Sequence, residues 1–414
     1  MWAVLAGTFT LRFSTGLTGA MLAVYLAALP EHGGPVVDPI VVGLFAATFY
    51  LAELILSPVF GILSDRLGHH RVMLYGPAFG AIAVIITGLT TNLVLLGGTR
   101  WLEGASTAAS IPSILGFIAI VTAGDEALRG RMSARFEGAT LLGLGAGFAA
   151  APITFELFGP IGFFLNAVLY GVSFLIFRLV RDPVGEAASL RAPHVGFGRY
   201  VELVRSSHVW LLAPTWIAVN ASIGLWFSQS IFQFARANPD FPDQVLMRGF
   251  ERWQISAAAV VIGIVFGLGL LYWGNRFKSL RRTTIILYGI LGGGALVAAG
   301  LVINHGEGLA PAVTLGAAAV AAFGLFVMAG ATPAALGLLA DVSERFPHDR
   351  GAIMGLYSVF LAIGQIIGAL IGGIAADLRG VDGMLIATIV LLAVALFPLA
   401  RLRRSEDELG VVPR

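Results

Sequence analysis

Long apolar runs, separated by short polar stretches, dominate the 414 residues of the chain. A helix that crosses a lipid bilayer needs about 20 mainly apolar residues. Twelve segments meet this requirement: 2–29, 40–63, 72–90, 93–123, 133–156, 159–180, 207–235, 253–273, 284–304, 308–341, 351–377 and 382–402. Their residues do not alternate in polarity as the strands of a membrane β-barrel do. We therefore predict an all-α membrane protein with twelve transmembrane helices.

The longest polar stretch, residues 181–206, is rich in Arg, Pro and Gly and separates six apolar segments from the next six. This pattern predicts an N-terminal six-helix bundle over 1–180 and a C-terminal one over 207–402. Residues 181–206 would form a linker and residues 403–414 a tail, both cytoplasmic. The first apolar run has no basic region before it and is long enough to span, so we expect a helix rather than a cleaved signal peptide.

The basic residues predict the orientation, because connections on the cytoplasmic side are enriched in Lys and Arg. With the N-terminus inside, 20 of the 26 basic residues fall in cytoplasmic segments and only 4 fall outside. Both termini are therefore expected in the cytoplasm. Lys278 is the only lysine, and such arginine usage is typical of a GC-rich bacterial genome. We expect a multi-pass protein of a bacterial inner or plasma membrane.

Composition excludes several classes of function. Hydrophobic residues make up 57% of the chain and charged residues 12%, about half the charged share of a soluble protein, which is roughly 25%. The net charge of +2 indicates no nucleic-acid partner. The chain has no cysteine, which excludes disulfides, thiolate metal sites and cysteine nucleophiles.

A weak internal repeat divides the chain into related halves. The stretch 61–71 ends an apolar segment with an Asp-Arg pair and a later Arg, and the stretch 275–281 repeats this pattern as Asn-Arg and Arg. Gly16 in the first segment aligns with Gly224 in the seventh at a similar offset. The repeat predicts that the two six-helix bundles are pseudo-symmetric.

The stretch 61–71 resembles the signature loop of the major facilitator superfamily, Gly-x-Leu-x-Asp-Arg-x-Gly-x-x-Arg, which joins helices two and three. The resemblance implies two bundles that alternate access to a central site, and a cytoplasmic latch in which Asp65 faces the helix N-terminus at 351–352. A solvated turn is the alternative. His69 and His70 replace basic residues usual in the family; we expect them to be a solvated surface pair, and a pH-sensitive latch is the alternative. The expected gating residues are Gly61, Asp65, Arg66, Gly68, Arg71, Asn275 and Arg276.

The fourth segment carries two ionisable residues, Arg100 and Glu103, followed by Gly104. It resembles a second motif of the family, Arg-x-x-x-Gly, which is associated with proton-coupled members. Residues three apart share a helix face, so the two side chains can pair. Ionisable residues inside a span indicate function, although a structural salt bridge is the alternative. Glu53 and Glu137 are the other candidates for proton coupling.

Residues 143–152 resemble the antiporter motif of the family, Gly-x-x-x-Gly-Pro-x-x-Gly-Gly. Gly147 and Pro152 fit the motif, while the closing glycine pair is missing. In the eleventh segment, Gly364 and Gly368 repeat the glycine spacing without the proline. The resemblance implies export by antiport, with these four residues at helix hinges. Close packing of small residues is the alternative.

Five further polar or aromatic residues in the spans are candidates to line a substrate cavity. Trp226, Gln229 and Gln233 share one face of the seventh segment, at spacings of three and four, where a lipid-facing position or core packing is the alternative. Arg12 and its repeat partner Asn220 lie in the first and seventh segments. Arg12 would either bind an anionic group or pair with an internal carboxylate, because an unpaired arginine in a span is expensive.

These features predict a secondary active transporter, with proton-coupled efflux of amphipathic or drug-like molecules as the main hypothesis. Uptake or exchange of a small anionic metabolite or lipid-like substrate is the alternative, and a non-transporting scaffold is the alternative of another class. No His-Glu-x-x-His, Gly-x-Ser-x-Gly or Walker sequence is present, so no enzyme is expected. We expect no cofactor and no metal. The expected partners are a small molecule, protons and the bilayer, with the protein a monomer.

Overall fold

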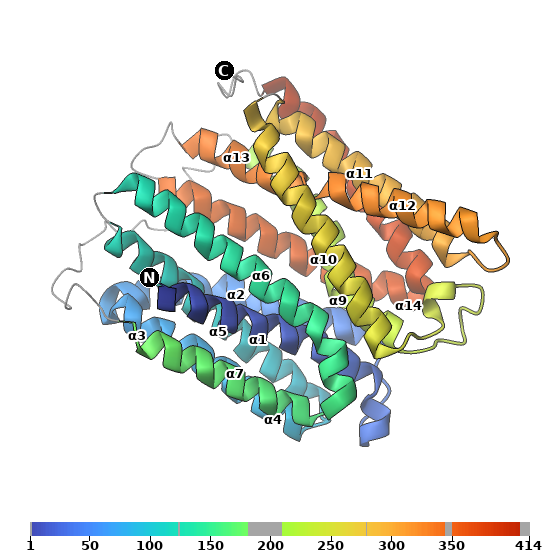
Figure 1. Cartoon of the computed structure of the whole chain (residues 1–414), viewed down its shortest axis with the longest axis horizontal. Coiled ribbons are helices and arrows are strands. Elements are labelled where there is room, and N and C mark those ends of the chain that lie inside the picture. Colours follow the sequence, from blue (N-terminus) through green and yellow to red (C-terminus); the bar gives the residue numbers. More distant parts are fainter. Residues whose placement is uncertain (1, 123–124, 181–208, 279, 344–349, 406–414) are drawn as a thin grey trace. The chain divides into compact units, whose positions relative to one another are not determined.

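The computed structural model describes residues 2–122, 125–180, 209–278, 280–343 and 350–405, and the regular elements in these ranges are all helices (Figure 1). The expected linker 181–206 and tail residues 406–414 lie outside them. The helices of the first half are α1(Trp2–Ala27), η1(Leu29–His32), α2(Pro39–Leu67), α3(His69–Met73), α4(Tyr75–Leu89), α5(Leu93–Val121), α6(Glu126–Phe158) and α7(Ile161–Arg178). Those of the second half are η3(Val209–Leu211), α9(Ala213–Ala235), η4(Val245–Met247), α10(Arg252–Gly274), η5(Asn275–Lys278), α11(Arg282–Asn304), α12(Pro311–Met328), α13(Ala331–Ser343) and α14(Arg350–Ser405).

The described part of the chain contains 9 helical stretches that are long and apolar enough to cross a membrane. One of them, Ser358–Arg404, has 47 residues, which is about 70 Å of helix and roughly twice the thickness of a hydrocarbon core. α1 and α9 are not among them, because Thr, Ser, Asn and Gln dilute their apolar character. The chain is therefore an all-helical membrane protein.

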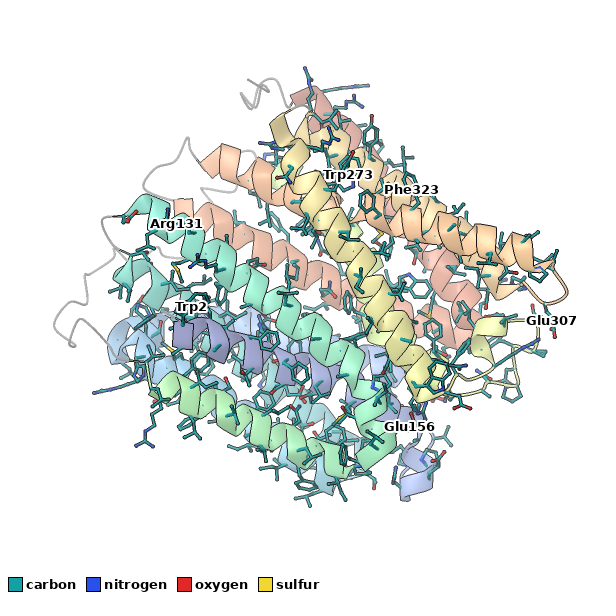
Figure 2. All side chains as sticks on the ribbon, in the orientation of Figure 1. Trp2, Arg131, Glu156, Trp273, Glu307 and Phe323 are labelled. Atoms are coloured by element: carbon teal, nitrogen blue, oxygen red, sulfur yellow. The ribbon has the colours of Figure 1, made fainter. Side chains whose placement is uncertain are left out.

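Many large apolar side chains point outward from the helices, as the sticks in Figure 2 show. Phe323, labelled there, is 66% exposed, and Leu271 and Phe397 are also largely exposed. In water such surfaces would promote association. In a bilayer they meet lipid chains of the same polarity, so the exposed apolar side chains agree with the membrane assignment.

Contacts divide the chain into two compact units. The N-terminal unit comprises Met1–Ala192 with Phe250–Val260, and the C-terminal unit comprises Pro193–Gly249 with Val261–Arg414. The boundary falls inside α10, so the first turns of this helix belong to the N-terminal unit and the rest to the C-terminal unit. Each unit is described below by itself.

The same helix pairs recur in the two units. In the N-terminal unit, α1 packs against α6 and α7, and α4 packs against α5 and α7. In the C-terminal unit, α9 packs along α14, and α11 packs against α12 and α14. α14 has two arms, 350–378 and 381–405, joined where Arg379 and Gly380 leave helical geometry. With these arms counted separately, α1, α6 and α7 correspond to α9 and the two arms of α14.

Glycines make the corresponding close contacts in each unit. A Cβ on Gly147 of α6 would overlap the carbonyl oxygen of Phe13 on α1. A Cβ on Gly368 of α14 would overlap the carbonyl oxygen of Ala221 on α9. Glycine allows the two backbones to approach closely, as small residues do in membrane helix pairs. The repeat seen in the sequence therefore corresponds to a repeated mode of helix packing.

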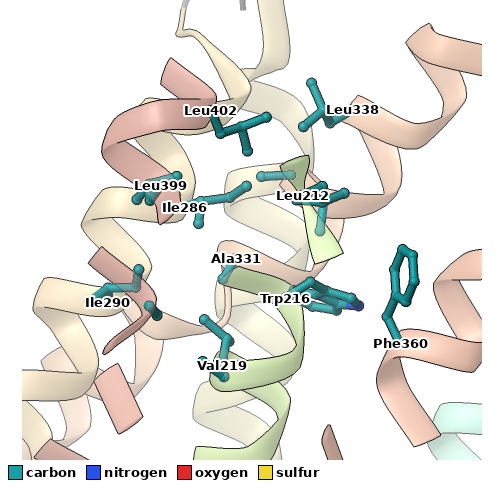
Figure 3. Packing of buried hydrophobic residues seen from close by; sticks show 14 of the residues in the cluster. Leu212, Trp216, Val219, Ile286, Ile290, Ala331, Leu338, Phe360, Leu399 and Leu402 are labelled. Atoms are coloured by element: carbon teal, nitrogen blue, oxygen red, sulfur yellow. The ribbon is translucent and has the colours of Figure 1, made fainter. Parts of the chain in front are cut away.

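A large apolar cluster fills the C-terminal unit at one end of its helices (Figure 3). Trp216 of α9 is 1% exposed and lies among side chains of α11, α13 and both arms of α14. In a bilayer such a cluster is stabilised by van der Waals packing rather than by loss of contact with water, because lipid chains are as apolar as the side chains. This cluster fixes the start of α9, and with it the positions of the polar residues farther along that helix.

Candidate functional site

A buried ion pair lies within α5. Asn92 caps this helix by accepting hydrogen bonds from the backbone N–H groups of Val94 and Leu95, at 2.9 Å and 3.2 Å. Two turns farther along, the guanidinium of Arg100 binds Oε2 of Glu103. Glu103 is 1% exposed and Arg100 is 8% exposed. The sequence spacing brought these two side chains together as expected.

The neighbouring helix α2 covers this pair. A Cβ on Gly104 would overlap the carbonyl oxygen of Phe49, so glycine at this position lets α2 approach α5. The Phe49 ring consequently lies over the guanidinium of Arg100, with 4.7 Å between the guanidinium carbon and the ring centroid. A cation over an aromatic face is attracted by the ring quadrupole. Arg100 thus has both a carboxylate and an aromatic partner.

One carboxylate oxygen of Glu103 makes no hydrogen bond in the described part of the chain. Its Oε1 atom is buried and has no hydrogen-bond partner among the residues that the structure describes. Such an atom is uncommon in folded proteins and calls for an explanation, such as a catalytic role or a bound water. This unsatisfied oxygen separates the pair from a fully satisfied structural salt bridge.

A second cluster of charged residues in the N-terminal unit contains Arg12 of α1. Its Nη1 donates to Oγ1 of Thr107 on α5 at 3.4 Å. Its charge also acts on the carboxyls of Glu53 on α2 and Glu137 on α6. Within the described residues, however, Arg12 forms no ion pair with any carboxylate at 4.0 Å or less. Of the two alternatives for Arg12, the described residues thus show a hydrogen bond to Thr107 and no internal ion pair.

The polar residues of α9 are largely buried. Gln233 donates through Nε2 to Oε1 of Gln229 at 3.4 Å, and both side chains are fully buried. Trp226 is half-buried and donates through Nε1 to Oγ1 of Thr388 on the second arm of α14 at 2.9 Å. Asn220 donates to the carbonyl of Trp216 in its own helix at 2.9 Å. The shared face of Trp226, Gln229 and Gln233 therefore holds a line of polar groups inside the unit.

The expected gating loop is a tight turn between α2 and α3. Gly61 lies in α2 and Gly68 ends it, with φ of +95° and its N–H donating to the carbonyl of Ser64 at 3.0 Å. Arg66 and Arg71 are exposed. Asp65 lies 3.7 Å from Nε2 of His69. Its expected partner is the helix N-terminus at 351–352. The side chains there are not among those that the structure describes.

The expectation that His69 and His70 form a solvated pair is wrong. His69 Nδ1 lies 3.1 Å from Oγ of Ser64, and its ring occupies the space beside Gly116, which has no side chain. His70 Nε2 lies 3.0 Å from the carbonyl oxygen of Phe177 on α7. Both histidines are therefore half-buried and fix the turn against α5 and α7.

The remaining expected residues lie on continuous helices. Pro152 lies inside α6, and Gly364 lies in the first arm of α14 against the carbonyl oxygen of Ile217. Asn275 and Arg276 begin the short helix η5(Asn275–Lys278), and Nη2 of Arg276 donates to the hydroxyl of Tyr272 at 3.0 Å. The glycines thus lie at helix contacts, and the second copy of the signature lies at the end of α10.

Sequence reasoning missed two residues of the site. Thr107 lies seven residues after Arg100 on α5, and Phe49 lies four residues before Glu53 on α2. Both spacings place a residue on the same face as a candidate already recognised. Helical spacing from the charged residues was therefore a signal that could have identified both.

Comparisons with known proteins agree with this architecture. The model of the Major Facilitator Superfamily matches residues 4–303 and, in a second match, residues 237–413. Multidrug resistance protein 2 of Bacillus subtilis (strain 168) is 25% identical over 342 residues, which cover 81% of this chain and 80% of the relative. Quinolone resistance protein NorA of Staphylococcus aureus (strain MSSA476) is 23% identical over 377 residues, which cover 90% and 88%.

The fold also matches a solved transporter. The crystal structure of the nucleoside transporter NupG superposes with a TM-score of 0.67 at 13% identity, covering 96% of this chain and 98% of that one. At this identity the likeness concerns the fold alone. Taken with the family match over most of the sequence, it establishes that the chain belongs to the Major Facilitator Superfamily and is a secondary transporter rather than an enzyme.

Proposed function

We propose that this chain is a proton-coupled exporter of amphipathic, drug-like molecules. The observation that carries the proposal is the buried pair of Arg100 and Glu103, in which one carboxylate oxygen has no described partner. A nearby guanidinium stabilises a carboxylate, whereas burial stabilises the neutral acid. Because these two influences oppose each other, a movement of either group can bind or release a proton.

The coupling would work through the changing surroundings of the pair. When Arg100 binds Glu103, the carboxylate is compensated and releases its proton. When Arg100 moves away, the buried carboxylate takes a proton up again, because an unpaired charge inside a span is expensive. Glu53 and Glu137 are the alternative proton carriers, since the charge of Arg12 acts on both.

The direction and the substrate class are supported by relatives. The two relatives described above are a multidrug resistance protein and a quinolone resistance protein by name. The many apolar and few charged side chains of the spans favour an amphipathic substrate over a highly charged one. Trp226 and Gln229 would contact it from α9, with Gln233 and Asn220 in support.

The proposed topology has twelve spans in two six-helix bundles, 1–180 and 207–402. Residues 181–206 would form a cytoplasmic linker and 403–414 a cytoplasmic tail. α1, α9 and the two arms of α14 complete this count, because each is long enough to span a bilayer. Asp65 and its neighbours in the turn after α2 would gate the cytoplasmic side.

Transport of a cationic fluorescent dye into proteoliposomes tests the proposal. Vesicles with an acidic lumen should accumulate dye as protons leave, and a protonophore should abolish the accumulation. Protein-free vesicles provide the baseline. If a broad panel of amphipathic dyes and drugs gives no accumulation above this baseline, the export proposal fails and the scaffold alternative gains support.

A second candidate is exchange of a small anionic metabolite. It is favoured by Arg12, whose guanidinium has a hydrogen bond to Thr107 but no ion pair in the described chain. The wild type should then take up an organic anion, and Arg12→Gln should abolish this uptake. If Arg12→Gln impairs dye export and no anion is transported by the wild type, the second candidate is excluded.

A further inference from the structure

Three segments of the C-terminal unit meet at a cluster around His305. The residue follows α11 and lies between two carboxylates. Its Nε2 is 2.8 Å from Oδ2 of Asp382, which lies just after the bend in α14. Its Nδ1 is 3.6 Å from Oδ2 of Asp243, which lies in the connection between α9 and α10. The ring therefore joins the end of α11, the start of the second arm of α14 and the connection 236–251.

Neutral side chains hold the Asp382 end of this cluster. Asn304 is fully buried and donates through Nδ2 to Oδ1 of Asp382 at 2.8 Å. Gln244 accepts the backbone N–H of Asp382 at 3.2 Å and donates to the carbonyl of Arg379 at 3.0 Å. These bonds do not change with pH. The contact with Asp243 is the longer one, and Asp243 is 69% exposed in its side chain.

We propose that His305 forms a pH-sensitive clasp with Asp243 and Asp382. The clasp is the pair of contacts that holds the connection between α9 and α10 against α11 and α14. An imidazolium carries N–H groups on both ring nitrogens and can donate to Asp382 and Asp243 at once. A neutral ring carries a single N–H. This proton stays at Nε2, where the shorter hydrogen bond to Asp382 forms, so the contact with Asp243 is lost. Among side chains, histidine is the one that ordinarily changes charge between about pH 5 and pH 8.

The other charges near the clasp have partners elsewhere or make no ion pair with His305. Arg248, on the same connection, binds the carboxylate of Glu307. Among the described residues, the acids Asp240 and Asp377 form no ion pair with the ring. Asp243 and Asp382 are thus the charged groups that face the imidazole. When protonated, the His305 ring therefore carries a positive charge next to both the Asp243 and the Asp382 carboxylates.

The clasp adds a regulatory feature to the proposed transporter. In the proposed topology, the connection between α9 and α10 faces the outside. A more acidic exterior would close the clasp and hold this connection against the ends of α11 and α14. A more alkaline exterior would release only the contact with Asp243 and loosen the connection there, because the hydrogen bonds of Gln244 and Leu246 on the same connection do not change with pH. The pH response of the connection itself does not depend on the proposed substrate or on proton coupling.

Hydrogen–deuterium exchange of residues 236–251 in the purified full-length protein tests the clasp. Exchange is measured at about pH 5.5 and about pH 8 and corrected for the intrinsic pH dependence of amide exchange. The wild type should lose protection at the higher pH by about two- to five-fold, as expected for a partly exposed ion pair. His305→Gln keeps an N–H donor for Asp382 but carries no charge. Its protection should be the same at both pH values, and Asp243→Asn should behave likewise.

A neighbouring variant provides the matched control. Arg248→Gln removes a different ion pair of the same connection and should lower protection at both pH values while the pH response remains. Equal pH responses in the wild type and His305→Gln would overturn the proposal. Loss of protection on addition of EDTA would also overturn it, because the three side chains would then hold a metal ion rather than a proton. Gel filtration of each variant confirms that it is folded.

Discussion

Glu103 binds Arg100 one turn earlier in α5, and its remaining oxygen is buried without a partner among the described residues. A buried polar atom left without a hydrogen bond costs about 1–3 kcal/mol. A residue kept only for stability would gain from a second donor at this oxygen. This arrangement supports the proposal that the Glu103 carboxyl changes its protonation during the transport cycle.

The buried pair of Arg100 and Glu103 also leads to a prediction about the thermal stability of the protein. Glu103→Gln leaves the buried guanidinium of Arg100 without a counter-charge, and removal of one partner of a buried pair costs about 3–5 kcal/mol. The Tm of the purified variant should fall accordingly. The double variant Arg100→Gln/Glu103→Gln removes both charges and should recover most of the loss. If Glu103→Gln keeps the wild-type Tm, the two groups do not depend on each other in the folded protein.

Gly147 should be intolerant of a side chain. A Cβ at this position meets the carbonyl of Phe13, so Gly147→Ala should force α1 and α6 apart. Overpacking of this kind costs about 1–3 kcal/mol, which is measurable as a lower Tm in detergent. Gly145→Ala in the same helix is the control, because nothing lies within 4 Å of its added Cβ. Equal effects of the two substitutions would contradict the contact.

Gly368→Ala is the corresponding variant in the C-terminal unit. Its Cβ would meet the carbonyl of Ala221 on α9, which is the same kind of contact as that of Gly147. A loss of stability similar to that of Gly147→Ala is expected. A neutral effect would show that the repeated helix pairs are not held together in the same way.

The topology can be tested directly, because the chain has no cysteine of its own. Single cysteines at position 190 and at the C-terminus should react with impermeant maleimide only from the cytoplasmic side. A cysteine replacing Asp240 should react from outside. The excess of arginine on one side motivates this orientation. Labelling of positions 190 and 240 from the same side would refute the twelve-span topology.

Asp65 should favour the outward-facing state if it latches the cytoplasmic side. Asp65→Ala should shift the population toward inward-facing forms, since couplings between sites are commonly about 1–3 kcal/mol. Distances between spin labels at the cytoplasmic ends of α2 and of the first arm of α14 report this shift. His69→Gln removes the ion pair of Asp65 with His69 within the turn and is the control. Unchanged distances in Asp65→Ala would remove this residue from gating.

The sequence predicted the parts that depend on local spacing. Apolar runs of spanning length predict helices because the bilayer imposes that length. The pairing of Arg100 and Glu103 was predictable because residues three apart share a helix face. The alignment of Gly16 with Gly224 anticipated the repeated packing, since a Cβ on either glycine would meet the backbone of α6 or α14, respectively.

Features that depend on contacts between distant segments were not predictable in this way. The position of Phe49 over Arg100 requires knowledge that α2 lies against α5. The half-buried state of His69 depends on space left by Gly116, which is far from it in the sequence. The clasp around His305 brings together three segments separated by about 60 or more residues, and no local pattern marks it.

Comparison of driven transport with exchange in the Glu103→Gln variant tests proton coupling most directly. Proteoliposomes containing the wild type, Glu103→Gln, Glu53→Gln or Glu137→Gln are each assayed for dye accumulation driven by a pH gradient and for dye exchange without one. Our account predicts that Glu103→Gln retains exchange and loses accumulation, while the other two variants retain both. Full accumulation by Glu103→Gln would contradict it, and loss of accumulation in Glu53→Gln or Glu137→Gln instead would assign the proton to that residue.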